Sequence, residues 1–187
     1  TGQRDNTIVV FMSDHGEMMG DHNIYLKGPY FYDAGVRVPF MIRYPGKVLP
    51  GRHSELVELV HLAPTLMDAA GAAPYAGMQG RSLLGWLSGE ASARKGDDSV
   101  YCEYYNAMPY HVDPTAQLTM LRTRTHKIVV DHAHDDGELY DLVADPLELD
   151  NLWRDPDALG LKADMLTRLT HRMAFTVDPL PPRLSEW

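Results

Sequence analysis

Cysteine is almost absent from this 187-residue sequence, which has a single one, Cys102. One cysteine forms no internal disulfide, so disulfides do not stabilise the fold, and the count does not fix the cellular compartment. Basic residues are also scarce. The sequence has 17 Lys and Arg residues but 26 Asp and Glu residues, which gives a formal charge of −9. This negative charge argues against binding to a phosphate backbone, so nucleic acid is not an expected partner.

Long hydrophobic runs are missing as well. No apolar stretch approaches the roughly 18–20 residues that a membrane-spanning helix needs, and residues 1–7 are too polar for a signal peptide. With 44% hydrophobic residues, the chain has the composition of one folded domain or of a large part of a bigger one. We therefore expect a globular protein without a membrane span, and the sequence leaves its localisation open.

The most informative segment is an apolar run at residues 7–12 that is followed by Ser13, Asp14, His15 and Gly16. A β-branched run of this length predicts a strand buried on both faces, as in a sheet covered by helices. Ligands of α/β sheets bind at the carboxyl ends of such strands, where a carboxylate beside an imidazole suggests a metal or an anionic substrate. A simple turn is the alternative, since these residue types favour turns.

A long loop follows this strand over residues 16–37, which we expect to contain one helical turn. Loops of this length are usually functional. Lys27 lies twelve residues after His15, so the loop can return it to the Asp14–His15 pair, where its ammonium would face an oxyanion. The alternative is an ordinary solvated lysine.

The remaining pattern predicts two packing units, residues 1–90 and residues 91–187. The first unit continues with an expected strand at 39–44 and helices at 61–70 and 82–87. In the second unit, strand-like runs predict an antiparallel sheet, and they occupy residues 100–105, 118–123, 127–130 and 138–140. Apolar positions from residue 157 onward mark one face of a helix that covers this sheet, namely Leu159, Met165, Leu166, Leu169 and Met173.

Several motifs occur along the chain in an order that resembles the sulfatase family of the alkaline phosphatase superfamily. They begin with the Ser-Asp-His-Gly segment and extend over residues 6–17, 20–22, 27–28, 36–39, 43–46, 59–66, 77–83, 122–127, 138–142 and 145–152. The resemblance implies an α/β fold: the carboxyl-terminal part of an alkaline-phosphatase-like helix-covered sheet, plus a small antiparallel sheet with a packed helix.

The resemblance also implies roles for three residues. Asp14 matches a carboxylate ligand of the family's single divalent cation, usually calcium, and His15 matches the neighbouring position, which is Asn or His. An imidazole there slightly favours a manganese-type site. Lys27 is similar to the lysine that binds the transferred sulfate or phosphonate group, and a cation with an ammonium would neutralise that oxyanion.

Two expected elements of the family are missing. Its nucleophile is a formylglycine made from the Cys or Ser of a Cys/Ser-x-Pro-x-Arg motif, which does not occur here, since Cys102 precedes Glu103 and the spacing at 179–183 begins with proline. The family's upstream pair of aspartates, which completes the metal site, is also missing. The resemblance therefore implies the carboxyl-terminal portion of a sulfatase-like protein that is inactive alone.

Other polar residues receive more modest predictions. His111 falls between two expected strands, where loops of such enzymes line the substrate pocket. His22 is expected to pack within its loop, and Arg37 to brace that loop through a carboxylate such as Asp33. Turn chemistry explains the hairpin histidines, His132 and His134, better than a metal cluster does.

Three functions remain open. The first is hydrolysis of a small sulfate ester, and the second is hydrolysis of a phosphonate monoester or phosphodiester by the same superfamily chemistry. The third is a non-catalytic scaffold or binding module that retains only the fold. A sheet that lacks neighbouring strands exposes edges and apolar surface, so we expect the chain to self-associate.

Overall fold

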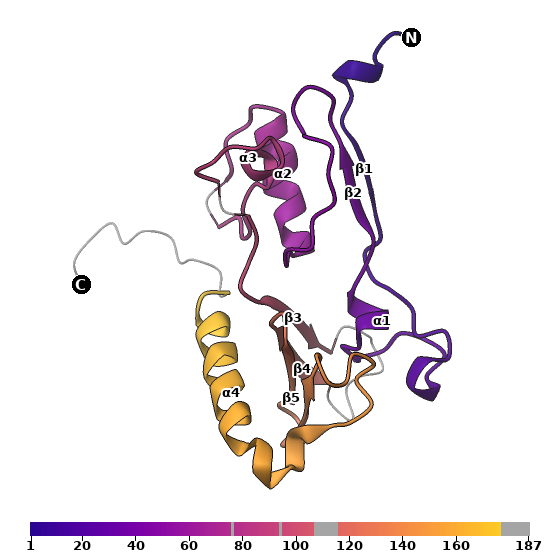
Figure 1. Cartoon of the computed structure of the whole chain (residues 1–187), viewed down its shortest axis with the longest axis vertical. Coiled ribbons are helices and arrows are strands. Elements are labelled where there is room, and N and C mark those ends of the chain that lie inside the picture. Colours follow the sequence, from indigo (N-terminus) through magenta and orange to yellow (C-terminus); the bar gives the residue numbers. More distant parts are fainter. Residues whose placement is uncertain (76, 94, 107–115, 177–187) are drawn as a thin grey trace, which may run out of the picture.

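A computed structural model describes residues 1–75, 77–93, 95–106 and 116–176. The chain has two parts, each with one sheet, and the two sheets lie toward opposite ends of the molecule (Figure 1). The elements of the first part are β1 (Val9–Met12), α1 (Asp33–Val36), β2 (Phe40–Arg43), α2 (Leu62–Ala69) and α3 (Leu84–Leu87). Those of the second part are β3 (Val100–Tyr105), β4 (Gln117–Arg122), β5 (His126–Asp131), β6 (Asp136–Asp141) and α4 (Leu159–Ala174). Single 3₁₀ turns lie at Arg4–Asn6, Asp21–Asn23, Leu59–His61, Leu152–Arg154 and Pro156–Ala158. The described helices include none with the length and apolar character of a membrane span.

The strands β1 and β2 form an antiparallel ladder in which Phe11 lies opposite Met41. Both strands are confirmed, but the prediction that the first is buried on both faces is wrong. Val9 and Phe11 are 50% and 58% exposed. Among the described residues β1 pairs with β2 alone and burial alternates along both strands, so one face of the ladder presents its apolar side chains to solvent.

Helices α2 and α3 confirm the two helices predicted in this part of the chain. Thr65, which is fully buried in α2, donates its hydroxyl to the carbonyl of His61 at 2.6 Å and accepts the backbone N–H of Leu83 at 2.9 Å. One hydroxyl thus fixes the start of α3 against α2.

The second part is a four-stranded antiparallel sheet in the order β3-β4-β5-β6, as the succession of short apolar runs predicts. Ile128 in the central strand β5 pairs with Leu121 on one side and with Leu139 on the other. All three side chains are fully buried, so the sheet is centred on this row.

The two faces of this sheet are covered by different parts of the chain. On one face, Leu121, Ile128 and Leu139 pack against Met165 and Leu169 of α4. On the other face, Met120 and Val129 pack against Phe31, from the loop just before α1. Figure 1 shows α4 and α1 on opposite sides of the sheet, so the sheet directly supports the loop that carries the candidate site.

The prediction that Leu159 belongs to the buried face of the helix is wrong. Leu159 is 62% exposed, whereas Met165 and Leu169 are both 2% exposed. Leu159 is the first residue of α4, and the buried stripe that contacts the sheet begins further along the helix.

Candidate functional site

Ser13, Asp14 and His15 form a tight turn at the carboxyl end of β1. The Ser13 hydroxyl donates to the carbonyl of His15 at 2.7 Å, and the Asp14 Oδ1 accepts the His15 N–H at 3.0 Å. These backbone N–H groups of Asp14 and His15, with the His15 ring, hold the pKa of the Asp14 carboxyl below its usual value. The turn therefore presents an ionised carboxylate that is 84% exposed.

The His15 ring is held in one tautomer by its neighbour. Its Nδ1 lies 2.7 Å from the carbonyl oxygen of Gly16, which accepts hydrogen bonds and has no proton to donate. The proton of the neutral ring is therefore on Nδ1, and Nε2 carries the lone pair. This is the arrangement in which a histidine binds a cation through one nitrogen while a carbonyl orients the other.

Lys27 returns to this pair, as the sequence predicts. Its Nζ lies 2.5 Å from the His15 Nε2, so the ammonium donates to the imidazole lone pair. The Asp14 Oδ2 lies 3.6 Å from the same nitrogen. A carboxylate, an imidazole and an ammonium thus meet at one exposed point, and their roles there remain predictions.

The Asp14 and His15 atoms fit part of a metal ligand set. Two atoms 3.6 Å apart can bind one ion at the usual ligand distances of about 2.0–2.5 Å. In residues 1–75, 77–93, 95–106 and 116–176, however, no group of three or more His, Cys, Asp or Glu side chains gathers around a common point. The two residues therefore suit a shared site that needs further ligands, and Lys27 competes for the lone pair that an ion would use.

Gly16 fixes this turn against α1. Its N–H donates to the carbonyl of Gly35 at 2.8 Å. A Cβ at position 16 would lie 1.9 Å from the carbonyl oxygen of Ala34, so only glycine allows the approach. The position of Asp14 and His15 therefore depends on the position of α1.

His22, His132 and His134 have structural partners, and His111 lies outside the described residues. The His22 ring stacks on Tyr32 with the ring centroids 3.7 Å apart, which confirms its packing role. His134 bonds to the Asp131 carboxylate at 2.8 Å, and His132 bonds to the Thr119 hydroxyl at 2.8 Å, as hairpin side chains do. His111 falls within 107–115, outside the described residues, so its predicted place in the substrate pocket stays a prediction.

A buried ionic cluster behind the loop was missed from the sequence. Lys127 of β5 is fully buried, and its Nζ donates to Asp33 Oδ1 at 2.7 Å and pairs with Glu148. The sequence did contain a signal for this cluster. Lys127 lies two residues before Val129 and therefore on the same face of β5, the face that packs against Phe31. A charged side chain on an apolar face needs a buried partner.

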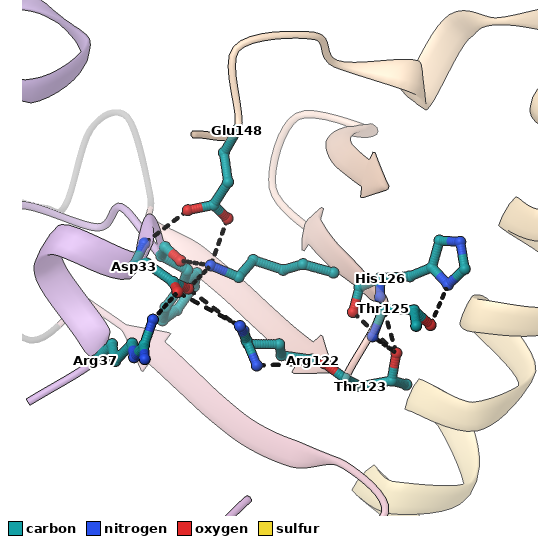
Figure 2. Close-up of polar contacts among 9 residues, drawn as sticks. Asp33, Arg37, Arg122, Thr123, Thr125, His126 and Glu148 are labelled. Carbon is teal, nitrogen blue, oxygen red and sulfur yellow. Dashed lines mark hydrogen bonds and ion pairs between the residues drawn. The ribbon is translucent and has the colours of Figure 1, made fainter. Parts of the chain in front are cut away.

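Asp33 lies at the centre of this cluster (Figure 2). Its burial opposes ionisation, but the Lys127 ammonium and then the Arg122 and Arg37 guanidiniums outweigh burial, so the pKa of Asp33 lies below its usual value. The Arg37 Nη1 lies 3.7 Å from the Asp33 Oδ2, which confirms the predicted brace.

Glu138 occupies the same region of the sheet. Burial raises the pKa of the Glu138 carboxyl and the charge of Glu148 adds to the shift, while the hydroxyls of Tyr140 and Tyr32 oppose it. Burial, followed by the charge of Glu138, also raises the pKa of Tyr140. The loop thus rests on a sheet surface rich in buried ionisable groups.

Comparison with known proteins identifies the family of this chain. The family model described as N-sulphoglucosamine sulphohydrolase, C-terminal, matches residues 20–174. The chain belongs to the sulfatase family. It is 32% identical over 157 residues to an N-acetylglucosamine-6-O-sulfatase of Bacteroides thetaiotaomicron, covering 81% of this chain and 27% of that protein. It is 35% identical over 161 residues to a choline-sulfatase of Rhizobium meliloti, covering 83% of this chain and 29% of that protein.

Solved structures of sulfatase relatives have the same fold. A phosphonate monoester hydrolase of Agrobacterium radiobacter matches with a TM-score of 0.84 and 29% identity, over 95% of this chain and 37% of that one. A protein solved in complex with its substrate D-glucosamine-2-N,6-O-disulfate matches with a TM-score of 0.80 and 28% identity, over 92% of this chain and 35% of that one. The chain thus has the α/β fold of these proteins and spans about a third of their length.

Proposed function

We propose that this chain is the carboxyl-terminal part of a metal-dependent sulfuric ester hydrolase, in which Lys27 binds the sulfate group and Asp14 and His15 bind a divalent cation. The observation that carries the proposal is the convergence of the Lys27 ammonium on His15, 2.5 Å from Nε2, beside the Asp14 carboxylate. These residues come from the end of one strand and from a loop twelve residues further on. Membership of the sulfatase family supports the reaction class.

In this proposal the anionic and neutral ligands bind the cation, and the cationic Lys27 binds the sulfate. Asp14 and His15 would hold a divalent cation, with calcium expected and manganese as the alternative, and that ion would polarise a sulfate oxygen as a Lewis acid. Lys27 donates an N–H to a second oxygen and neutralises charge as the S–O bond to the leaving group lengthens. His15 keeps its Nε2 lone pair directed at this point, because the Gly16 carbonyl holds the proton on Nδ1.

The nucleophile is expected from a formylglycine outside these 187 residues, so we propose that the chain is inactive alone. Cys102 does not replace it. The Cys102 thiol is half-buried in β3, and burial raises its pKa, which disfavours the reactive thiolate.

Phosphonate monoester hydrolysis is the second candidate, because the structural neighbour with a TM-score of 0.84 is such an enzyme. Sulfate esters and phosphonate monoesters differ mainly in the charge of the transferred group. Hydrolysis of an aryl sulfate and of an aryl phosphonate by the complete natural protein separates the two. No turnover of either substrate would leave only the scaffold or binding module.

Binding of inorganic sulfate to the chain itself tests the anion site. A titration followed by NMR at constant ionic strength, with chloride as the competing anion, should shift the amides of His15, Gly16 and Gly28 in a saturable way. Lys27→Met should weaken sulfate binding by about tenfold or more, because a charge-assisted hydrogen bond is lost. Lys47→Met, which removes an exposed lysine after β2, is the matched control and should bind as the wild type does. Equal affinities of both variants would refute the assignment of Lys27.

A further inference from the structure

Lys127 connects the antiparallel sheet to the loop that carries the candidate site. Its ammonium donates to the carbonyl of Phe31 at 2.9 Å and to Asp33 Oδ1 at 2.7 Å, and it pairs with Glu148. Three partners match the three N–H donors of an ammonium. Phe31 and Asp33 follow Lys27 closely in the chain. The sheet therefore binds the loop just after Lys27, the candidate anion-binding residue.

Glu148 reaches the same place from an unusual turn. Its side chain is buried, whereas Leu147 and Leu149 beside it are 68% and 70% exposed. Two leucines point outward and a carboxylate points inward, the reverse of the usual distribution. The φ of Glu148 is 59°, a left-handed conformation that costs energy in a residue other than glycine and that persists where its surroundings impose it. The conformation of this turn therefore serves to place the Glu148 carboxylate in the interior.

Glu148 also contacts the start of α1, at Asp33 (Figure 2). Its Oε2 accepts the N–H of Asp33, the first residue of α1, at 2.7 Å across a separation of 115 residues. At the other end of α1, the Gly35 carbonyl accepts the N–H of Gly16 at 2.8 Å, and Gly16 directly follows His15. One short helix therefore links Glu148 to the turn that holds Asp14 and His15.

We infer that Glu148 and Lys127 are positioning residues that hold α1 in place and thereby keep His15 and Lys27 together. The inference rests on the proposed function only for what the loop binds, because the contacts between the sheet, α1 and Gly16 stand without it. We do not expect either residue to contact the substrate. Their effect reaches the site through the Asp33 N–H, the Phe31 carbonyl and the Gly16–Gly35 hydrogen bond.

Amide hydrogen exchange of the 187-residue chain measures this tether without any activity. Glu148→Gln removes the charge opposite Lys127 and should accelerate exchange of the Gly16 amide by about tenfold or more, while the Ile128 amide in the central strand exchanges as in the wild type. Sulfate affinity, measured by the same NMR titration as above, should fall in this variant.

Glu58→Gln is a closely matched control. Glu58 also has a mostly buried side chain that accepts a backbone N–H, that of Tyr101 at 2.6 Å, and pairs with a cation, Arg172 at 2.7 Å, and neither contact involves the loop. This variant should leave the exchange of Gly16 and the sulfate affinity unchanged. If Glu148→Gln does not fold, Glu148→Asp, which keeps the charge and shortens the side chain, is judged by the same measurements.

Three results would overturn the inference. Gly16 exchange could stay at the wild-type rate, or it could rise only in step with Ile128, which reports global destabilisation. Gly16 exchange could also rise with sulfate affinity unchanged, which would mean that the tether does not position the site. If the wild-type chain does not bind sulfate at all, the proposed function fails, and the exchange of Gly16 in Glu148→Gln still decides whether the tether exists.

Discussion

The Nζ of Lys27 lies 2.5 Å from the Nε2 of His15. Because the Gly16 carbonyl holds the ring proton on Nδ1, Lys27 donates to the one lone pair that this imidazole can offer a cation. Lysine and cation are alternatives at this atom. A cation bound to His15 therefore leaves the Lys27 ammonium available for a second partner, and an anion bound beside the cation would supply one.

Cation binding should depend on Asp14 and His15 together. We expect Asp14→Asn and His15→Gln each to weaken binding of Mn²⁺ or Ca²⁺ to the complete natural protein by about tenfold or more, because each removes a direct ligand. Isothermal titration calorimetry with each metal measures this. His134→Gln, which alters a hairpin histidine paired with Asp131, is the control and should leave the affinity unchanged. Equal losses in all three variants would point to nonspecific binding.

The contact between α4 and the sheet predicts a contrast between two leucines of one helix. Leu169→Ala should lower the free energy of unfolding by about 2–4 kcal/mol, because it opens a cavity against the core of the sheet. Leu159→Ala should change it by less than about 0.5 kcal/mol, because that side chain is 62% exposed. Urea denaturation of the two variants tests the observed helix face, and similar losses in both would contradict it.

The raised pKa of Glu138 predicts that the stability of the fold depends on pH. Folding raises its pKa above the usual value of 4.5, so the folded state binds this proton more tightly than the unfolded state does. The stabilisation is fully present below the unfolded pKa and is lost as pH rises through the folded pKa. Glu138→Gln should therefore be more stable than the wild type at neutral pH, and the gain should vanish on acidification.

Thermal unfolding of this variant at several pH values measures the effect. Glu103→Gln, which removes an exposed carboxylate from β3, controls for the change in net charge. A Glu138→Gln variant that gains no more than Glu103→Gln at neutral pH would contradict the assignment.

The face of the β1–β2 ladder that contains Val9, Phe11 and Met41 should drive self-association. These apolar side chains are 50%, 58% and 59% exposed, and Phe11 pairs with Met41. Analytical ultracentrifugation of the wild-type chain should show concentration-dependent association, and Phe11→Glu should reduce it by placing a charge on this face. A monomeric wild type at all concentrations would show that the exposed face does not associate.

The elements and the candidate site were predictable for different reasons. Strands such as β3 and helices such as α2 follow from local apolar periodicity. The pair Asp14 and His15 follows from its position directly after a strand, and Lys27 from a loop short enough to return it. In each case the information lies within a few tens of residues of sequence.

The tether was not predictable in this way. The pairing of Glu148 with the Asp33 N–H spans 115 residues and depends on how the loop packs on the sheet. A glutamate between two leucines suggests a solvated turn, and only the fold shows the leucines outside and the carboxylate inside. The exposure of Val9 and Phe11 was likewise not predictable, because the apolar sequence of a strand does not determine which other elements cover it.

Hydrolysis of an aryl sulfate by the complete natural protein tests the role of Lys27, with wild type, Lys27→Met and Lys47→Met assayed side by side in the presence of Ca²⁺ or Mn²⁺. We expect turnover by the wild type, a loss of kcat/KM of about a hundredfold or more in Lys27→Met, and wild-type kinetics in Lys47→Met, because only Lys27 faces the developing charge. Full activity of Lys27→Met would show that Lys27 does not bind the sulfate group.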